Sequence, residues 1–189
     1  MSPYRDPTTL PDGWPVVSNT QMIVFGICTV LLWLLILTSR HSSVFLLSYV
    51  NLAIHEGGHI VCRPFGLTIH VWGGTLFQCL MPLAIGVHFW RRRQTAGTAV
   101  MGLWLGQNLL EVSVYAADAK ARVLPLLFGK GSIHDWHYIF NKLGCLSSCT
   151  TIATGIKVAG WLIMFAAAGW YIWRWRMSVE HAQRQANSQ

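Results

Sequence analysis

The stretch "SSVFLLSYVNLAIHEGGHIVCRPFG", residues 42–66, begins as an apolar run and then carries two histidines, a glutamate and an arginine. The apolar part is typical of a membrane helix, which needs about 20 apolar residues to cross the hydrocarbon core. Ionisable side chains are costly in lipid, and those found inside a membrane segment usually serve a function. The stretch therefore predicts a membrane helix with a functional site on it.

The composition of the whole chain also indicates a membrane protein. Only 11% of its 189 residues are charged and 53% are hydrophobic, whereas soluble domains carry about 25% charged residues. The net charge is +7, and the basic residues gather at the ends of apolar runs, in "TSRH", "FWRRRQ" and "YIWRWRM". This placement favours contact with lipid headgroups over nucleic-acid binding. We therefore expect the lipid bilayer as a partner and no nucleic acid.

Five apolar segments follow one another along the chain, each close to the length of a membrane crossing. They cover residues 21–38, 43–62, 70–90, 96–116 and 156–173. We predict an all-α integral membrane protein with about five transmembrane helices and a short extra helix in the long loop between the fourth and the fifth. The predicted parts are a polar N-terminal tail (1–20), a single helical membrane domain (21–176) and a polar C-terminal tail (177–189).

The long loop, residues 117–155, contains "HDWHYIFNKLG". Its apolar periodicity and its final Lys-Leu-Gly predict the short extra helix. Five crossings would put the two termini on opposite sides of the membrane. The side with the C-terminus carries more arginines in its short connections, which indicates that this side is cytoplasmic.

The segment His55-Glu56-Gly57-Gly58-His59 fits the pattern His-Glu-x-x-His. Residues four apart share one face of a helix, so His55 and His59 can hold one Zn²⁺. Glu56 can then act as general base on a water that the metal activates. The alternative interpretation is a pair of histidines whose nitrogens are satisfied by neighbouring helices.

Polar residues on other helices are expected near the same depth. A rise of 1.5 Å per residue places His55, Gln78 and Asn108 each about 12 Å from the membrane face where the second helix ends. One side of the fourth helix carries a polar stripe of Gln107, Asn108, Glu111, Tyr115 and Asp118. We expect Asn51, Asn108 and Glu111 to orient the histidine ligands. For Gln78 we favour a hydrogen bond that only holds the helices together.

A catalytic zinc usually has three protein ligands and a water, so one more ligand is needed. The segment "SIHDWHY" offers His134, Asp135 and His137 in the long loop. His134 or Asp135 can bind the metal directly, and the other can orient a ligand imidazole. Glu111 is a deeper rival, and His137 is expected at the wet interface instead.

The pair Gly73-Gly74 follows "TIHVW" between the second and third apolar segments. One interpretation is a short extended edge that holds a peptide substrate as an added strand. The other is a turn before the next helix.

The stretch "AIHEGGHIVCRPFG", followed by "VWGGT", resembles the site-2-protease class of intramembrane zinc metalloproteases over residues 50–80. The resemblance implies that His55 and His59 bind zinc and that Glu56 is the catalytic base. The Leu-Asp-Gly motif that supplies the third ligand in that class does not occur here. Residues 50–145 also resemble a family of small bacterial membrane proteins, on "FWRRRQ", "WLGQNLLEVSVYAADAKARVLPLL" and "HDWHYIF". That likeness implies that "HDW" belongs with the metal site.

We therefore expect a membrane-embedded zinc metallohydrolase of the bacterial inner membrane, with its C-terminus in the cytoplasm. The favoured reaction is peptide hydrolysis, with a membrane protein as substrate. The alternative is a non-catalytic, metal-stabilised subunit or scaffold that binds partner subunits in a larger membrane complex. Metal transport is a third hypothesis, supported only by the polar stripe.

Overall fold

The computed structural model describes residues 8–39, 43–125 and 133–188. Within these ranges the regular structure is helical, apart from one isolated bridge between Thr9 and Pro15. The helices are α1 (Asn19–Thr38), α2 (Phe45–Cys62), α3 (Leu67–Arg91), α4 (Thr95–Ala117), α5 (Asp135–Lys142) and α6 (Cys149–Ala186), with 3-10 turns η1 (Arg63–Phe65) and η3 (Leu146–Ser148). Each predicted apolar segment falls on one of the five long helices, and α5 confirms the extra helix in the loop.

Among the residues that the structure describes, three helical stretches are long and apolar enough to cross a membrane. They are α1, α3 and the stretch Leu146–Ala186, which contains α6. The outward face of α1 shows how apolar this surface is, since Ile23, Ile27 and Leu37 are each more than half exposed. An apolar surface of this extent suits lipid and not water. The structure thus agrees with a membrane protein, although it does not establish five crossings.

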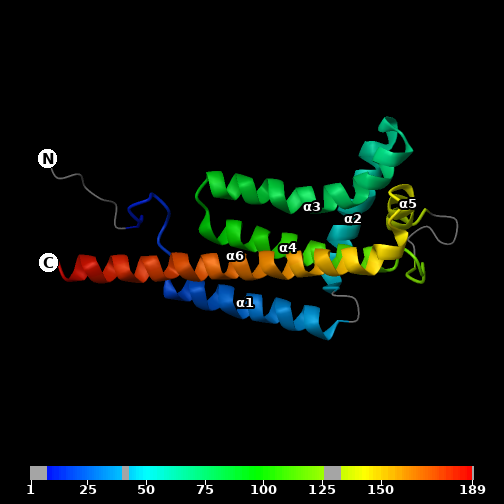
Figure 1. Ribbon diagram of the computed structural model, residues 1–189. Helices are drawn as coiled ribbons and strands as arrows, with labels where there is room; N and C mark the ends of the chain where they lie inside the picture. Colours follow the sequence, from blue (N-terminus) through cyan, green and yellow to red (C-terminus); the bar gives the residue numbers. More distant parts are fainter. Residues whose placement is uncertain (1–7, 40–42, 126–132, 189) are drawn as a thin grey trace.

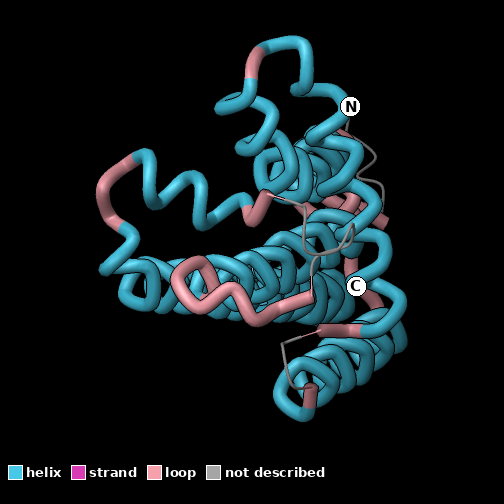
Figure 2. Tube along the Cα trace, turned by 90° about the vertical axis from the view of Figure 1, so that its right-hand side faces the viewer, coloured by secondary structure: helices cyan, strands magenta, loops and turns pink. Residues whose placement is uncertain are grey.

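The helices form a bundle with one member lying across it. Figure 1 shows α1, α3, α4 and α6 running along a common direction, while α2 crosses them steeply at the end where α5 also lies. Figure 2 is a view from that end, in which the long helices run away from the viewer. We call this the site end of the bundle, because it carries α2, α5, the end of α4 and the start of α3.

Hydrogen bonds at both ends of α2 explain its transverse position. Ser48, in its first turn, donates to Glu111, which lies in the last two turns of α4. The Nδ1 atom of His59, in the last turn of α2, lies 2.7 Å from the carbonyl oxygen of His70 in the first turn of α3. Glu111 and His70, the partners of the two ends of α2, both belong to the site end. This differs from the expectation of a spanning second helix, which would place Ser48 beside the opposite end of α4.

Close packing against α3 holds α2 in place. Gly58 of α2 and Gly73 of α3 touch backbone to backbone, and a Cβ atom on either residue would overlap the carbonyl oxygen of the other. Small residues of this kind allow two helices to approach closely. Both Gly73 and Gly74 lie inside α3, so the expectation of an extended edge or a turn at this pair is wrong.

The N-terminal segment packs against α6 at the other end of the bundle, which we call the terminal end. The backbone N–H of Val17 donates to Ser178 Oγ at 2.9 Å, and the guanidinium of Arg174 pairs with the Asp12 carboxylate at 2.5 Å. The residues predicted as a polar C-terminal tail continue α6 as far as Ala186. Figure 1 shows the start of α1 and the end of α6 on the same side of the molecule, whereas the expected five crossings would place them on opposite sides.

Candidate metal centre

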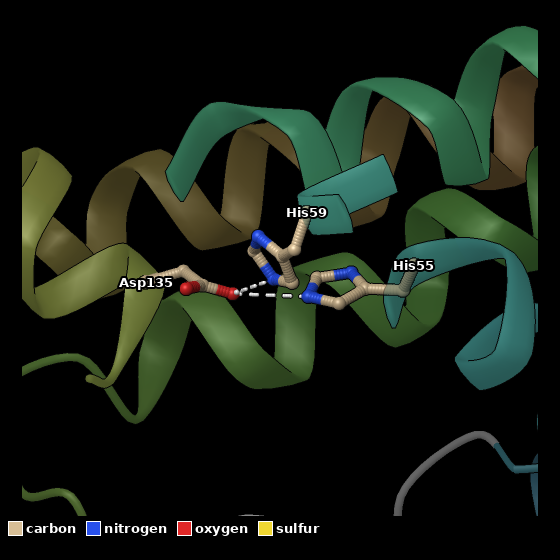
Figure 3. Close-up of side chains that lie close together, drawn as sticks. All are labelled: His55, His59 and Asp135. Carbon is tan, nitrogen blue, oxygen red and sulfur yellow. Dashed lines mark hydrogen bonds and ion pairs between the residues drawn. The ribbon is translucent and has the colours of Figure 1, made fainter. Parts of the chain in front are cut away.

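Two histidines and one aspartate converge at the site end. His55 and His59 lie one turn apart on α2, and Asp135 is the first residue of α5 (Figure 3). The Nε2 atoms of His55 and His59 lie 2.9 Å and 3.2 Å from Asp135 Oδ2, and the three candidate ligand atoms lie within 4.8 Å of one another. Tetrahedral ligands about 2.0–2.1 Å from zinc are about 3.3 Å apart, which is close to the two distances from the Nε2 atoms to Asp135 Oδ2.

The other ring nitrogen of each histidine faces an oxygen. His55 Nδ1 lies 3.1 Å from Gln78 Oε1, and His59 Nδ1 lies 2.7 Å from the carbonyl oxygen of His70. The Gln78 amide is oriented in turn by Asn108, whose Oδ1 accepts from Gln78 Nε2 at 3.0 Å. Each Nδ1 therefore carries a proton and donates it to the oxygen, so that Nε2 is the nitrogen of each ring that can bind a metal.

The charges at the centre favour a cation. Burial raises the pKa of the Asp135 carboxyl, but the hydrogen bonds and charges of His55 and His59 outweigh burial and hold that pKa below its ordinary value. The carboxylate is therefore ionised. Without a metal ion, protons on the two Nε2 atoms supply these hydrogen bonds, and a metal ion would take the place of those protons between the nitrogens and the carboxylate oxygen. Two imidazoles with one carboxylate are also a typical ligand set of catalytic zinc.

Gly74 of α3 has no side chain, and this leaves room for the two imidazoles beside it. A Cβ atom at this position would lie 2.5 Å from Nε2 of both His55 and His59. Any side chain would therefore displace the two nitrogens from Asp135. The residue is needed for the geometry of the centre, although it binds nothing itself.

A cavity of about 870 Å³ opens over the centre. His55, His59 and Asp135 form part of its wall, and Glu56 lines it beside them. Glu56 is half-buried, and its carboxylate has no hydrogen-bond partner in the part of the chain that the structure describes. A free carboxylate beside a metal centre and an open cavity is the arrangement that a general base requires.

The predicted orienting residues fall into two groups. Asn108 reaches His55 through Gln78, so it acts at the centre, and Gln78 itself does more than the sequence indicated. Asn51 instead donates to Gln107 Oε1 at 2.8 Å and to Glu111 Oε2 at 2.7 Å. Asn51 and Glu111 thus join α2 to α4, and Glu111 is not among the three converging ligands.

His134 serves as the N-cap of α5. Its Nδ1 accepts from the backbone N–H of His137 at 3.2 Å, and its Nε2 lies 3.2 Å from Asp118 Oδ2. Burial lowers the pKa of His134, and the hydrogen bond to Asp118 only partly offsets this, so the ring is neutral. His134 therefore positions α5, and with it Asp135, while its own nitrogens are engaged elsewhere. His137 Nδ1 lies 2.8 Å from the carbonyl oxygen of Ala119.

Sequence reasoning did not assign a role at the centre to Asp118, His70 or Gly74, which all shape it. Asp118 ends the polar stripe of α4, and its carboxylate also accepts from the backbone N–H groups of Val123 and Leu124, both at 3.0 Å. It therefore anchors the chain that leads towards α5. The position of Asp118 at the end of the stripe was the one available signal. The roles of His70 and Gly74 depend on the contact between α2 and α3, which no local pattern reveals.

Comparison with known proteins gives no relative. No protein-family model, no curated protein and no solved structure matches the chain. The functional assignment therefore rests on the geometry of the centre and its cavity.

Proposed function

We propose that the protein is a membrane-embedded zinc metallohydrolase that cleaves peptide bonds. One observation carries this proposal. Both histidines of the His-Glu-x-x-His motif contact the same oxygen atom, Asp135 Oδ2. Asp135 lies on another helix, 80 residues further along the chain than His55. If the two histidines needed only hydrogen-bond partners, a buried carboxylate placed between their Nε2 atoms would not be required.

The chain supplies the groups that such a reaction needs. A zinc ion bound by His55, His59 and Asp135 would provide a Lewis acid that lowers the pKa of a water to about 7. Glu56 faces the same cavity, where its carboxylate takes the proton of the attacking water and later gives it to the leaving amine. Gln78 and the His70 carbonyl hold the two imidazoles in the required tautomer.

For the membrane we propose four crossings, by α1, α3, α4 and α6, with α2 lying across the site end. Helix α4 has 23 residues, which corresponds to about 34 Å. Asn108, at the level of the centre, precedes the last residue of α4 by nine positions, or about 14 Å. The centre thus lies below the membrane surface on the side of the site end.

The direction of insertion follows from the basic residues. Arg91, Arg92 and Arg93 lie in the exposed turn between α3 and α4 at the terminal end, and Arg176 lies on the same end of α6. Basic residues in short connections favour the cytoplasm. We therefore place both termini in the cytoplasm, in a bacterial inner membrane, with the cavity nearer the opposite surface.

The walls of the cavity indicate the substrate. Besides the centre and polar residues such as Arg63 and Glu111, they carry apolar side chains, among them Leu52, Ile60 and Val112. Ile60 of α2 is 72% exposed. An apolar cavity that opens beside an exposed apolar helix face suits a segment of a membrane protein better than a polar peptide.

Replacement of Glu56 by Gln tests the catalytic part of the proposal. Hydrolysis of quenched-fluorescent apolar peptides in detergent is expected to fall about 10²- to 10⁴-fold, because general acid–base catalysis is lost, while bound zinc stays at the wild-type level. Glu180→Gln is the control, since Glu180 lies on the exposed C-terminal part of α6. A wild type that binds zinc but cleaves none of the peptides would favour the non-catalytic, metal-stabilised subunit instead.

A further inference from the structure

Tyr115 of α4 lies directly beside the metal centre. Its hydroxyl oxygen accepts a hydrogen bond from the backbone N–H of Asp135 at 3.2 Å. The centroid of its ring lies 4.4 Å from that of His134 and 6.2 Å from that of His55. The side chain also forms part of the cavity wall. Three contacts therefore fix the phenol next to the residues that would hold zinc.

The hydroxyl proton of Tyr115 remains available. A phenol both accepts and donates hydrogen bonds, and here the bond from Asp135 uses only an acceptor position. Among the described residues, none accepts the Tyr115 O–H. A half-buried phenol with one satisfied lone pair and a free proton can donate into the cavity.

The neighbouring histidines His134 and His70 already use ring nitrogens in other hydrogen bonds. Both nitrogens of His134 are held, by the N–H of His137 and by Asp118. His70 Nδ1 lies 2.8 Å from the carbonyl oxygen of His59. Tyr115 is thus a neutral donor next to the ligands whose proton is not yet committed to another residue.

We propose that Tyr115 is a second catalytic residue, which hydrogen-bonds to the substrate carbonyl oxygen as negative charge builds on it; this rests on the proposed hydrolase function. Water gives a proton to Glu56, and its oxygen forms a bond to the carbonyl carbon. The π electrons of the carbonyl move to its oxygen, where the Tyr115 O–H donates. The oxygen's electron pair then re-forms the C=O bond as the C–N bond breaks, and the nitrogen keeps the electron pair of that bond and takes the proton from Glu56. A donor aimed at developing charge is one of the strongest sources of catalysis.

The test uses acetohydroxamate as a probe, because its carbonyl oxygen and its anionic hydroxamate oxygen bind a metal together, much as a carbonyl group and the attacking oxygen would. Wild-type protein in detergent is loaded with Co²⁺, and binding of the probe is followed through the visible absorption of cobalt. Tyr115→Phe is expected to bind acetohydroxamate about 10- to 100-fold more weakly, since a hydrogen bond to a charged oxygen is lost. Cobalt affinity and the spectrum without probe are expected to stay unchanged.

Tyr138→Phe is the matched control, because the Tyr138 hydroxyl contacts Thr68 at 3.1 Å, away from the centre. It is expected to bind acetohydroxamate as the wild type does. Equal probe affinity in wild type and Tyr115→Phe would overturn the role of Tyr115 and leave the metal centre intact. Loss of cobalt or a changed spectrum in Tyr115→Phe would also overturn it, because Tyr115 would then support or bind the metal. A wild type that binds no cobalt would contradict the hydrolase proposal itself.

Discussion

Gly74 shows how one residue without a side chain can determine a site. The centre needs the Nε2 atoms of His55 and His59 to meet at one carboxylate oxygen, and α3 passes close beside both rings. The backbone of α3 can come this near only where a residue lacks a Cβ atom. Gly57, in the same motif as the histidines, has nothing within 4 Å of where a Cβ atom would lie. The absence of a side chain is therefore needed at Gly74, where it makes room for the two rings, but not at Gly57.

Gly74→Ala is expected to lower zinc affinity at least about tenfold, the scale seen when the support of metal ligands is lost. The added methyl group would push both imidazoles away from Asp135. Gly57→Ala is expected to bind zinc as the wild type does, because the new methyl group meets open space. Titration of the metal-free proteins with zinc against a competing chelator measures both. Equal affinities would show that the rings do not sit against Gly74 as described.

The limits of prediction at this scale follow from the range of each interaction. The pairing of His55 with His59 depends only on the repeat of one helix, so a four-residue spacing suffices to predict it. Which of His134 and Asp135 is the third candidate metal ligand depends on which of these two neighbours caps α5. His134 accepts the backbone N–H of His137 and turns towards Asp118, which leaves Asp135 to face α2. Residue spacing alone does not separate these roles.

At the scale of elements, apolar length predicts where helices lie but not how they are oriented. All five long helices were predicted from apolar runs, and α2 has the 18 residues of a helix that could span. Its direction is set by contacts between distant residues, namely Ser48 with Glu111 and the backbone contact of Gly58 with Gly73. A transverse helix within lipid needs an apolar face just as a spanning one does, so composition does not distinguish the two.

The N-terminal segment gives a prediction for pH at this scale. The hydrogen bond from Arg174 holds the pKa of Asp12 below its ordinary value, so the contact stabilises the fold above the unfolded pKa near 3.9. That stability is lost as the pH falls towards the lowered folded value. Because the Asp12 side chain is 41% exposed, the effect is expected to be about 1 kcal/mol or less.

Thermal unfolding in detergent, followed between pH 6 and pH 3, measures this contribution. The melting temperature of wild type is expected to fall more steeply on acidification than that of Asp12→Asn, which has no carboxylate to protonate at this position. Comparison of the two proteins removes the effect of every other acidic group. Parallel curves for the two would mean that Asp12 and Arg174 are not paired in the folded protein.

At the scale of the whole molecule, the bundle has two ends with different tasks. The terminal end gathers the N-terminal segment, the arginines of the α3–α4 turn and the second half of α6. The site end gathers α2, α5 and the cavity. The topology that we propose follows from the transverse position of α2, because it leaves four helices to cross the bilayer and an even number returns the chain to its starting side.

Reporter fusions at the two termini test this topology. A reporter that is active only in the cytoplasm is expected to give signal when fused to either end, since the proposed topology puts both termini on the cytoplasmic side. A periplasmic reporter is expected to stay silent at both ends. Signal from the cytoplasmic reporter at one terminus and from the periplasmic reporter at the other would favour five crossings and contradict a transverse α2.

The metal content of the purified protein tests the central claim most directly. The chain is purified in detergent without chelators and without a histidine tag, and zinc is measured by elemental analysis. The account predicts one zinc per chain in wild type, and a small fraction of that in His59→Ala and in Asp135→Ala, with His134→Ala retaining more than either. A wild-type protein free of metal, or full zinc in the His59→Ala and Asp135→Ala variants, would contradict it.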